Sequence, residues 1–217
     1  MKLSEDNYDN IAKCEEEKDL GVIFDKYISF GAHIKNSVNK ANSMIGMIRR
    51  TFTFIDGEIF TNLYKSLVRP HGNIVWFPQL KRQSVAIEKV QRRATKLIPT
   101  LKDLDYKERL RQLKLPTLKY RRYKGDLIQV FKIIDEIDDM KFEEFFTATK
   151  LDSTRNSEHK LYIHFTKTKT RKFAFSNTVA PTWNSLLPCT KKAQSINQFK
   201  SLLDKDPNLL VRFLLLF

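Results

Sequence analysis

The chain has 217 residues, a formal net charge of +14 at pH 7 and 41% hydrophobic residues. That length suits one large domain or two small ones, with enough apolar residues for a core. Only two cysteines, Cys14 and Cys189, and four scattered histidines are present, which argues against a disulfide framework and a zinc site. The low cysteine content favours an intracellular setting, nucleus or cytoplasm. No apolar run approaches the roughly 20 residues of a membrane-spanning helix.

The positive charge is concentrated in one stretch of the chain. Residues 81–124 contain 15 Lys/Arg and 4 Asp/Glu, so this stretch carries +11 of the +14. Such a concentration favours a polyanionic partner, most simply nucleic acid, over a general need for solubility. An anionic membrane surface or an acidic protein is the alternative partner.

The N-terminal part predicts a disordered lead-in followed by a hairpin. Residues 1–17 are polar and acidic and lack the pattern of a signal peptide. Two β-prone runs follow, Leu20–Phe24 and Tyr27–Phe30. They are predicted to pair around a turn at Asp25–Lys26.

Two amphipathic helices are predicted next. The first opens between Ser29 and Ala32 and ends in Arg49–Arg50, where cations suit the helix dipole. Its apolar face is Ile34, Val38, Ala41, Ile45 and Ile48. Asp56 caps the second, which closes at Arg69–Pro70. Its inward residues are Ile59, Phe60, Leu63, Tyr64, Leu67 and Val68. In the aromatic connector that follows, residues 71–78, we interpret Trp76 as a core residue.

The pattern of residues Ser84–Ile98 predicts an amphipathic helix with one apolar and one cationic side. Ser84 caps its start and Pro99 stops it. One side is apolar, with Ile87, Val90, Ala94, Leu97 and Ile98. The opposite side carries a cationic stripe, which consists of Lys89, Arg92, Arg93 and Lys96. Such a stripe can follow a phosphate backbone because each contact releases condensed counterions. The alternative interpretation is a solvated outer face of a core helix.

The helical block continues to about residue 149. Asp105 and Glu108 resemble a capping box for a helix that ends near Leu113. Pro116–Thr117 opens a longer helix. Its inward residues are Leu127, Val130, Phe131, Ile134 and Ile137. A short helix at Phe142–Phe146 completes the block.

The composition changes near Lys150 and predicts a basic region of strand and helix. Leu161, Ile163 and Phe165 alternate with polar residues, which is typical of an edge strand or hairpin. Helices are predicted at Asn177–Leu187 and Ser195–Asp204. In the second, Ser195 and Gln198 form a capping-box pattern, and its inward residues are Phe199, Leu202 and Leu203.

The pair Asp138–Asp139 is the candidate for metal-dependent catalysis. Polymerases use paired carboxylates to hold two metal ions, and they need a tight strand turn and another carboxylate from a distant strand. Here the pair ends a predicted helix beside Asp135 and Glu136. We interpret it as a solvated helix end. We therefore expect no metal, cofactor or small-molecule substrate, and no catalysis by this chain alone.

The order of several segments resembles a known family. Residues 18–205 resemble the region that follows the polymerase core in non-LTR, LINE-type (jockey-like) retrotransposon reverse transcriptases. The segments of this chain that carry the resemblance to that region are KDLGV (18–22), VNKANSMIGMIRRTF (38–52), LYKSLVRPH (63–71), VWFPQL (75–80), EKVQRRATKLI (88–98), residues 106–120 and RRYKGD (121–126). Two further segments, RKFAFSNTVAPTWNSLL (171–187) and SINQFKSLLDK (195–205), resemble the C-terminal end of the proteins of that family.

The resemblance implies a transposable-element RNA-directed DNA polymerase. In that family the hairpin lies close to the primer end, and the helices form a thumb domain that grips template–primer duplex. The implied partner is RNA or RNA–DNA duplex, bound without sequence specificity. The implied nucleic-acid-facing residues are Arg49, Arg50, Lys89, Arg92, Arg93 and Lys96, and the resemblance adds Arg121, Arg122 and Lys124. The parent polymerase uses Mg²⁺ at a Tyr-x-Asp-Asp turn in its palm, a motif that this sequence does not contain.

The sequence departs from the family at three places. About three residues are missing between His71 and Gly72, Pro181 falls within a helix, and the tail from Asp206 has no counterpart. These departures suggest a truncated element copy, a fragment without the catalytic palm. The alternatives are a basic interaction or membrane-peripheral protein, or part of an intact reverse transcriptase.

The predicted fold class is mainly α (α+β). It comprises a lead-in (1–17), a palm-adjacent β-hairpin (18–32), a thumb-like helical domain (33–149), a basic strand-plus-helix C-terminal region (150–206) and a hydrophobic tail (207–217).

Overall fold

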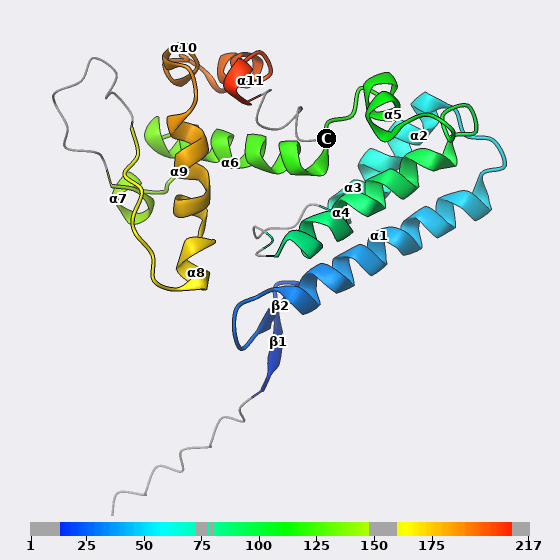
Figure 1. The fold of residues 1–217 in the computed structure, drawn as a ribbon, viewed down its shortest axis with the longest axis horizontal. Coiled ribbons are helices and arrows are strands. Elements are labelled where there is room, and N and C mark those ends of the chain that lie inside the picture. Colours follow the sequence, from blue (N-terminus) through cyan, green and yellow to red (C-terminus); the bar gives the residue numbers. More distant parts are fainter. Residues whose placement is uncertain (1–13, 73–77, 79, 148–159, 210–217) are drawn as a thin grey trace, which may run out of the picture.

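The computed structural model describes residues 14–72, 78, 80–147 and 160–209. Within them the fold is mainly helical with a small β part, as the sequence predicts. Figure 1 shows a two-stranded hairpin at the foot of the long helix α1 (Gly31–Thr51), with α4 (Lys81–Ala94) alongside it. Helix α6 (Leu118–Ile134) leads from this group to a second group of helices that contains α9 and α11 (Figure 1). Of the predicted connector 71–78, residues 73–77, which include Trp76, lie outside the described part, and residues 71–72 belong to a helix.

The hairpin forms, but the predicted turn at Asp25–Lys26 is wrong. Strands β1 (Glu16–Asp19) and β2 (Val22–Asp25) pair antiparallel around Leu20–Gly21. Both turn residues have positive φ, 45° and 82°, as a two-residue turn that matches the strand twist requires, and glycine supplies the second at low cost. Asp25 instead organises the approach to α1, because its carboxylate accepts from Tyr27 N, Ser29 N and Ser29 Oγ. The predicted lead-in therefore contains the first residues of β1.

Helix α1 confirms the predicted apolar face. Ile34, Ala41, Ile45 and Ile48 are buried, and Val38 is half-buried. Asp56 caps α2 (Gly57–Leu63) as predicted, since its Oδ1 accepts from Ile59 N at 2.7 Å. Ile59 itself is exposed, so its predicted inward position is wrong.

The helix that starts at Gly57 continues past Arg69–Pro70, where the sequence predicts its end. A π-helical turn, η1 (Tyr64–Val68), joins α2 to α3 (Arg69–Gly72). The N–H of Arg69 donates to the Tyr64 carbonyl five residues earlier. This wider turn relieves the contact that a proline ring otherwise makes with the carbonyl four residues before it.

Helix α4 begins one turn earlier than predicted, and Ser84 is not its cap. The start is closed by the Gln83 side chain, whose Oε1 accepts from Leu80 N at 3.0 Å. After Ala94 the chain tightens into η2, a 3₁₀ turn (Thr95–Leu97). The predicted apolar side is confirmed, with Ile87, Val90, Ala94 and Ile98 buried and Leu97 half-buried.

Helix α5 (Tyr106–Gln112) and helix α6 form where predicted. Asp105 Oδ2 accepts from Lys107 N, and Thr117 Oγ1 accepts from Tyr120 N. Helix α6 ends at Ile134, so Ile137 lies beyond it and is exposed, against the prediction. A short helix, α7 (Phe142–Phe145), follows.

Within residues 160–209 the C-terminal region contains helices, and Leu161 forms an isolated β-bridge where the sequence predicts a strand. Its helices are α8 (Lys169–Lys172), α9 (Phe175–Asn184), α10 (Pro188–Lys191) and α11 (Ile196–Leu203). Leu161 is buried, while Ile163 and Phe165 are exposed. The Asn184 side chain satisfies the backbone of Leu161 on both sides, accepting from its N–H at 2.9 Å and donating to its carbonyl at 2.8 Å.

The two predicted C-terminal helices form, but α9 ends at Asn184 rather than at the predicted Leu187. Pro181 lies inside α9 without ending it. Ser195 Oγ accepts from Gln198 N at 3.2 Å, as predicted, whereas the Gln198 side chain accepts from Gln194 N. Phe199 and Leu203 are buried and Leu202 is half-buried.

Two large apolar clusters occupy the two groups of helices. The first packs α1, α2, η1, α4 and α5 around residues such as Phe60 and Val90. The second packs α6 against α9 and α11, around Trp183 and Phe199. Leu209, in the predicted tail, is buried in the second cluster, and residues 210–217 lie outside the described part. No helix among the described residues is long and apolar enough to cross a membrane.

Candidate nucleic-acid interface

The cationic stripe lies on the outer side of α4 and η2, opposite the buried Val90 and Ala94. All four of its side chains are exposed, as predicted. They border a shallow depression between the end of α4 and the start of α5, which is also lined by the cations Lys102 and Arg109 and by the acids Asp103 and Asp105. The stripe is therefore a continuous cationic surface on two consecutive helical segments.

Two members of the stripe are held by uncharged partners. The Arg92 guanidinium lies over the Tyr106 ring, 4.7 Å from its centroid. Arg93 Nη1 donates to Asn42 Oδ1 on α1 at 3.1 Å. Within the described part of the chain, neither Lys89 nor Lys96 forms an ion pair. The charge of the partly buried Glu88 acts on Arg92, so it partly compensates the stripe from below.

Tyr106 is fixed beneath the stripe by Glu88. Its hydroxyl donates to Glu88 Oε1, and this bond connects α5 to α4. Burial raises the pKa of Glu88, and hydrogen bonds from Tyr106 and from the backbone of Lys119 and Leu118 oppose that rise. Glu88 therefore ties the stripe helix to the first turns of both α5 and α6.

Arg109 is a structural arginine that the sequence did not single out. It is buried, and its Nε donates to Thr95 Oγ1 at 3.0 Å. Its Nη1 donates to the Leu104 carbonyl. These bonds fix the loop between η2 and α5, and they leave Arg109 unable to serve as a surface cation.

The remaining sequence-predicted cations lie elsewhere. Arg49 and Arg50 are exposed in the last turn of α1, and within the described residues no hydrogen bond or ion pair joins them to the stripe. Arg121, Arg122 and Lys124 line a different surface, a hollow of about 1290 Å³ bounded by η1, α3, α5, α6 and α11. Tyr106 lies in the wall of both the hollow and the stripe's depression.

We call this second surface the cationic hollow. Nine cationic side chains line it: Lys65, Arg69, Lys107, Arg111, Lys114, Arg121, Arg122, Lys124 and Lys200. Two acidic side chains line it with them, Asp126 and Asp204. The structure thus divides the nine sequence-predicted residues between the stripe, the hollow and the end of α1.

The two acids of the hollow each face one cation. Asp204 Oδ1 pairs with Lys124 Nζ and accepts from the Tyr120 hydroxyl at 3.1 Å. Burial raises the pKa of Asp126 to about 6, and the nearby charge of Arg122 opposes the rise. Burial also lowers the pKa of Arg122. Lys124 and Arg122 are therefore already engaged within the chain.

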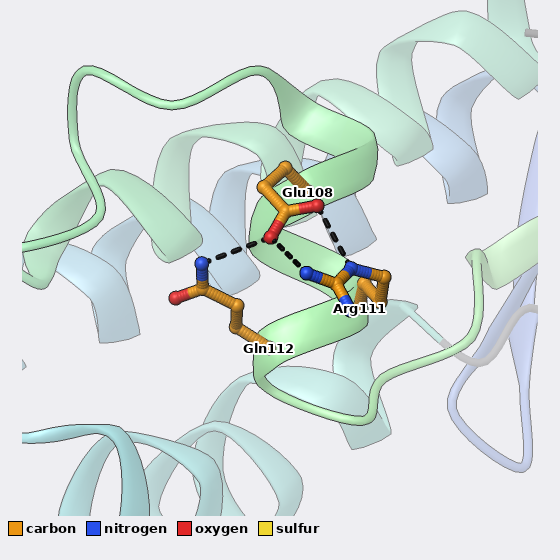
Figure 2. A network of polar contacts seen from close by, with 3 residues as sticks. All are labelled: Glu108, Arg111 and Gln112. Atoms are coloured by element: carbon orange, nitrogen blue, oxygen red, sulfur yellow. Dashed lines mark hydrogen bonds and ion pairs between the residues drawn. The ribbon is translucent and has the colours of Figure 1, made fainter.

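Arg111, at the edge of the hollow, is neutralised by a local network (Figure 2). Glu108 accepts from Arg111 Nε at 2.8 Å, from Arg111 Nη2 at 2.6 Å and from Gln112 Nε2 at 2.9 Å. These bonds lower the pKa of Glu108 to about 2. The Glu108 side chain thus turns toward the end of α5, and the predicted capping box with Asp105 keeps only its Asp105 half.

The carboxylate pair Asp138–Asp139 follows α6 rather than ending it. Asp138 accepts from Gln129 Nε2 at 2.8 Å and from Lys132 Nζ at 3.2 Å. These bonds lower its pKa. Among the described residues, no group of three or more His, Cys, Asp or Glu side chains lies close enough together to hold a metal ion.

No protein-family model, curated protein or solved structure matches this chain. The resemblance to retrotransposon reverse transcriptases stays a prediction from the sequence segments.

Proposed function

We propose that this chain is the thumb-like part of a non-LTR retrotransposon reverse transcriptase and grips template–primer nucleic acid inside the cell. The cationic stripe carries the proposal. Four cations are exposed together on one helical face, and the opposite face of the same helix is buried. The order of the sequence segments supplies the link to that family.

The stripe suits contact with phosphates rather than with bases. Lysine and arginine bind phosphate oxygens, and such contacts set position without reading sequence. The Arg92 guanidinium carbon lies over the Tyr106 ring, 4.7 Å from its centroid. A cation–π contact uses the charge of the guanidinium and not its N–H donors, which can still bind a phosphate. We therefore expect binding to RNA–DNA or RNA duplex without sequence preference.

Polymerisation itself is not part of the proposal for this chain alone. In the family that the sequence resembles, Mg²⁺ is held by palm carboxylates of a Tyr-x-Asp-Asp turn, which this sequence lacks. The carboxylate of Asp138 is engaged by Gln129 and Lys132. We propose that this chain binds the template–primer duplex and that the palm of the parent polymerase catalyses nucleotide addition.

The test is the salt dependence of duplex binding. The triple variant Arg92→Ala/Arg93→Ala/Lys96→Ala should weaken binding to two unrelated RNA–DNA duplexes equally. Removal of one cation–phosphate interaction lowers the slope of log affinity against log salt by about 0.9, so the slope should fall by roughly 2.7. The matched control is Lys167→Ala/Lys169→Ala/Lys172→Ala, which removes the same charge from exposed residues at α8.

Two results would overturn the proposal. If the stripe variant keeps the affinity and slope of the unmodified chain, the stripe is only a solvated helix face. If vesicles with anionic lipids bind the chain and the stripe variant loses that binding while duplex binding is weak throughout, the chain is a membrane-peripheral protein.

A further inference from the structure

The cationic hollow differs from an ordinary basic surface because its cations converge. Its walls come from η1 and α3, from the connection between α5 and α6, from α6 itself and from α11. Residues far apart in sequence, such as Lys65 and Lys200, thus line one concave space. Low-dielectric walls around like charges focus the field into the hollow.

The acids of the hollow leave most of this charge uncompensated. Asp204 pairs with Lys124, Asp126 faces Arg122, and Glu108 pairs with Arg111. No described acidic side chain forms an ion pair with the following five cations of the hollow: Lys65, Arg69, Lys114, Arg121 and Lys200. The hollow therefore carries a large net positive charge in the chain by itself.

Arg69 and Arg121 show what this imbalance costs. Both side chains are partly buried, and the Arg121 Nε is fully covered without a hydrogen-bond partner. Burial lowers the pKa of Arg69, and the charge of Arg121 lowers it further. Like charges in a shared, partly desolvated space destabilise the fold unless an anion compensates them.

The chemistry of these side chains selects the class of anion. A guanidinium presents a planar fork of donors that fits phosphate bidentately, and lysine adds mobile point charges around it. A hollow of about 1290 Å³ has room for several phosphate groups. A rigid duplex lies across a concave site, whereas a flexible chain of phosphates can fold into it.

We propose that the cationic hollow is a second anion-binding site, separate from the cationic stripe, that takes a flexible run of neighbouring phosphates. The phosphates come from an unpaired nucleic-acid strand or from a free polyphosphate. The site goes beyond the proposed grip on duplex, since it uses other residues and another ligand geometry. Arg69 and Arg121 are its central donors, with Lys65, Lys114 and Lys200 around them.

The experiment measures binding of inorganic tripolyphosphate to the full chain by calorimetry. Arg69→Gln/Arg121→Gln should weaken binding by at least about tenfold, since each arginine contributes charge-assisted hydrogen bonds. Arg49→Gln/Arg50→Gln is the matched control, because it removes the same charge from an exposed helix end. The control should change the affinity by no more than about twofold, through general electrostatics.

A second variant guards against misfolding. Lys114 and Lys200 are exposed, so Lys114→Gln/Lys200→Gln should leave the melting temperature unchanged and still weaken tripolyphosphate binding. The Arg69→Gln/Arg121→Gln variant should melt no lower than the unmodified chain, because it removes a repulsive pair. Tripolyphosphate should raise the melting temperature of the unmodified chain more than that of this variant.

Competition distinguishes the two phosphate sources. An unpaired oligonucleotide that displaces tripolyphosphate identifies a strand as the source, and one that does not displace it identifies a free polyphosphate. The proposal is overturned if tripolyphosphate does not bind at millimolar concentration, or if the Arg49/Arg50 control weakens binding as much as the Arg69/Arg121 variant. Duplex binding by the stripe variant is measured separately, so failure of the proposed function and failure of this site are distinguishable.

Discussion

The cationic stripe and the cationic hollow hold side chains of the same charge in different surroundings. The stripe lies on the exposed side of α4 and η2, and two of its arginines contact the uncharged Asn42 and Tyr106. The hollow collects cations from several elements into a concave space, where acids engage some of them. One surface is built by helical periodicity and the other by tertiary packing.

The two surfaces therefore differ in how strongly they indicate a bound anion. Charge on an exposed helix face is solvated at little cost, so the stripe alone is compatible with a plain solvent-facing surface. Charge in a partly buried hollow carries a desolvation penalty, as the lowered pKa of Arg69 and Arg122 indicates. A fold that retains unpaired cations at such a cost points to a ligand more strongly than a fold with cations in water.

The largest expected effect separates the two sides of α4. Val90→Asp places a carboxylate where the side chain is 3% exposed, and an unpaired buried charge should reduce the free energy of unfolding by more than about 4 kcal/mol. Urea unfolding measures the loss. Lys89→Asp introduces the same group one residue earlier on the exposed side, and it should change stability by only about 0.5 kcal/mol. Equal effects of the two variants would show that α4 is not packed as described.

The next expected effect concerns Asp126 in the wall of the hollow. Its pKa is raised to about 6, from an ordinary value of 3.8. The folded chain therefore holds this proton more tightly than the unfolded chain, and stability falls as pH rises from about 4 through 6. The size of that fall is about 3 kcal/mol, from 1.36 kcal/mol per pKa unit.

Asp126→Asn removes this pH dependence while leaving the other groups in place. Its stability relative to the unmodified chain should increase by up to about 3 kcal/mol between pH 4 and pH 7, measured by urea unfolding at both. Asp105→Asn serves as the control, because hydrogen bonds from the backbone of Lys107 and Tyr106 lower the pKa of Asp105 below its ordinary value of 3.8. That contribution to stability is lost only as pH falls below about 4, so the stability of Asp105→Asn relative to the unmodified chain should change little between pH 4 and pH 7. A stability difference for Asp126→Asn that is constant with pH would show that Asp126 is not buried beside Arg122.

The sequence predicted those parts of the molecule that depend on neighbours within one helix. The apolar face of α1 and both faces of α4 follow from the 3.6-residue period. The caps Asp56, Thr117 and Ser195 follow from local side-chain chemistry. The stripe was predictable for the same reason, since its four members belong to consecutive turns.

The predictions that failed depend on partners distant in sequence or on unusual backbone. The residues around Leu161 alternate like a strand, yet the Asn184 side chain bonds both backbone groups of Leu161. One backbone bond, from the Tyr162 N–H to the Thr147 carbonyl, joins this segment to the end of the preceding block. Leu20 adopts a positive φ that leucine rarely takes, and this moved the turn. A π-helical turn carried the helix through Pro70. The hollow was missed because Lys65, Arg69 and Lys200 lie outside the basic stretch 81–124, and no pattern within one helix connects them.

The smallest expected effect uses the network of Figure 2 to adjust the charge of the hollow. Glu108 neutralises Arg111, and its pKa of about 2 keeps it ionised at any practical pH. Glu108→Gln should release Arg111 toward the hollow and strengthen tripolyphosphate binding by about threefold, within the range of an exposed ion pair. Duplex binding through the stripe should change less, because Arg111 does not line the stripe's depression. Gln112→Ala is the matched control, since it removes the other contact to Glu108 without altering charge. Weaker tripolyphosphate binding by Glu108→Gln would mean that Arg111 serves only as a structural partner of Glu108. Arg111 would then not belong to the anion-binding residues of the hollow.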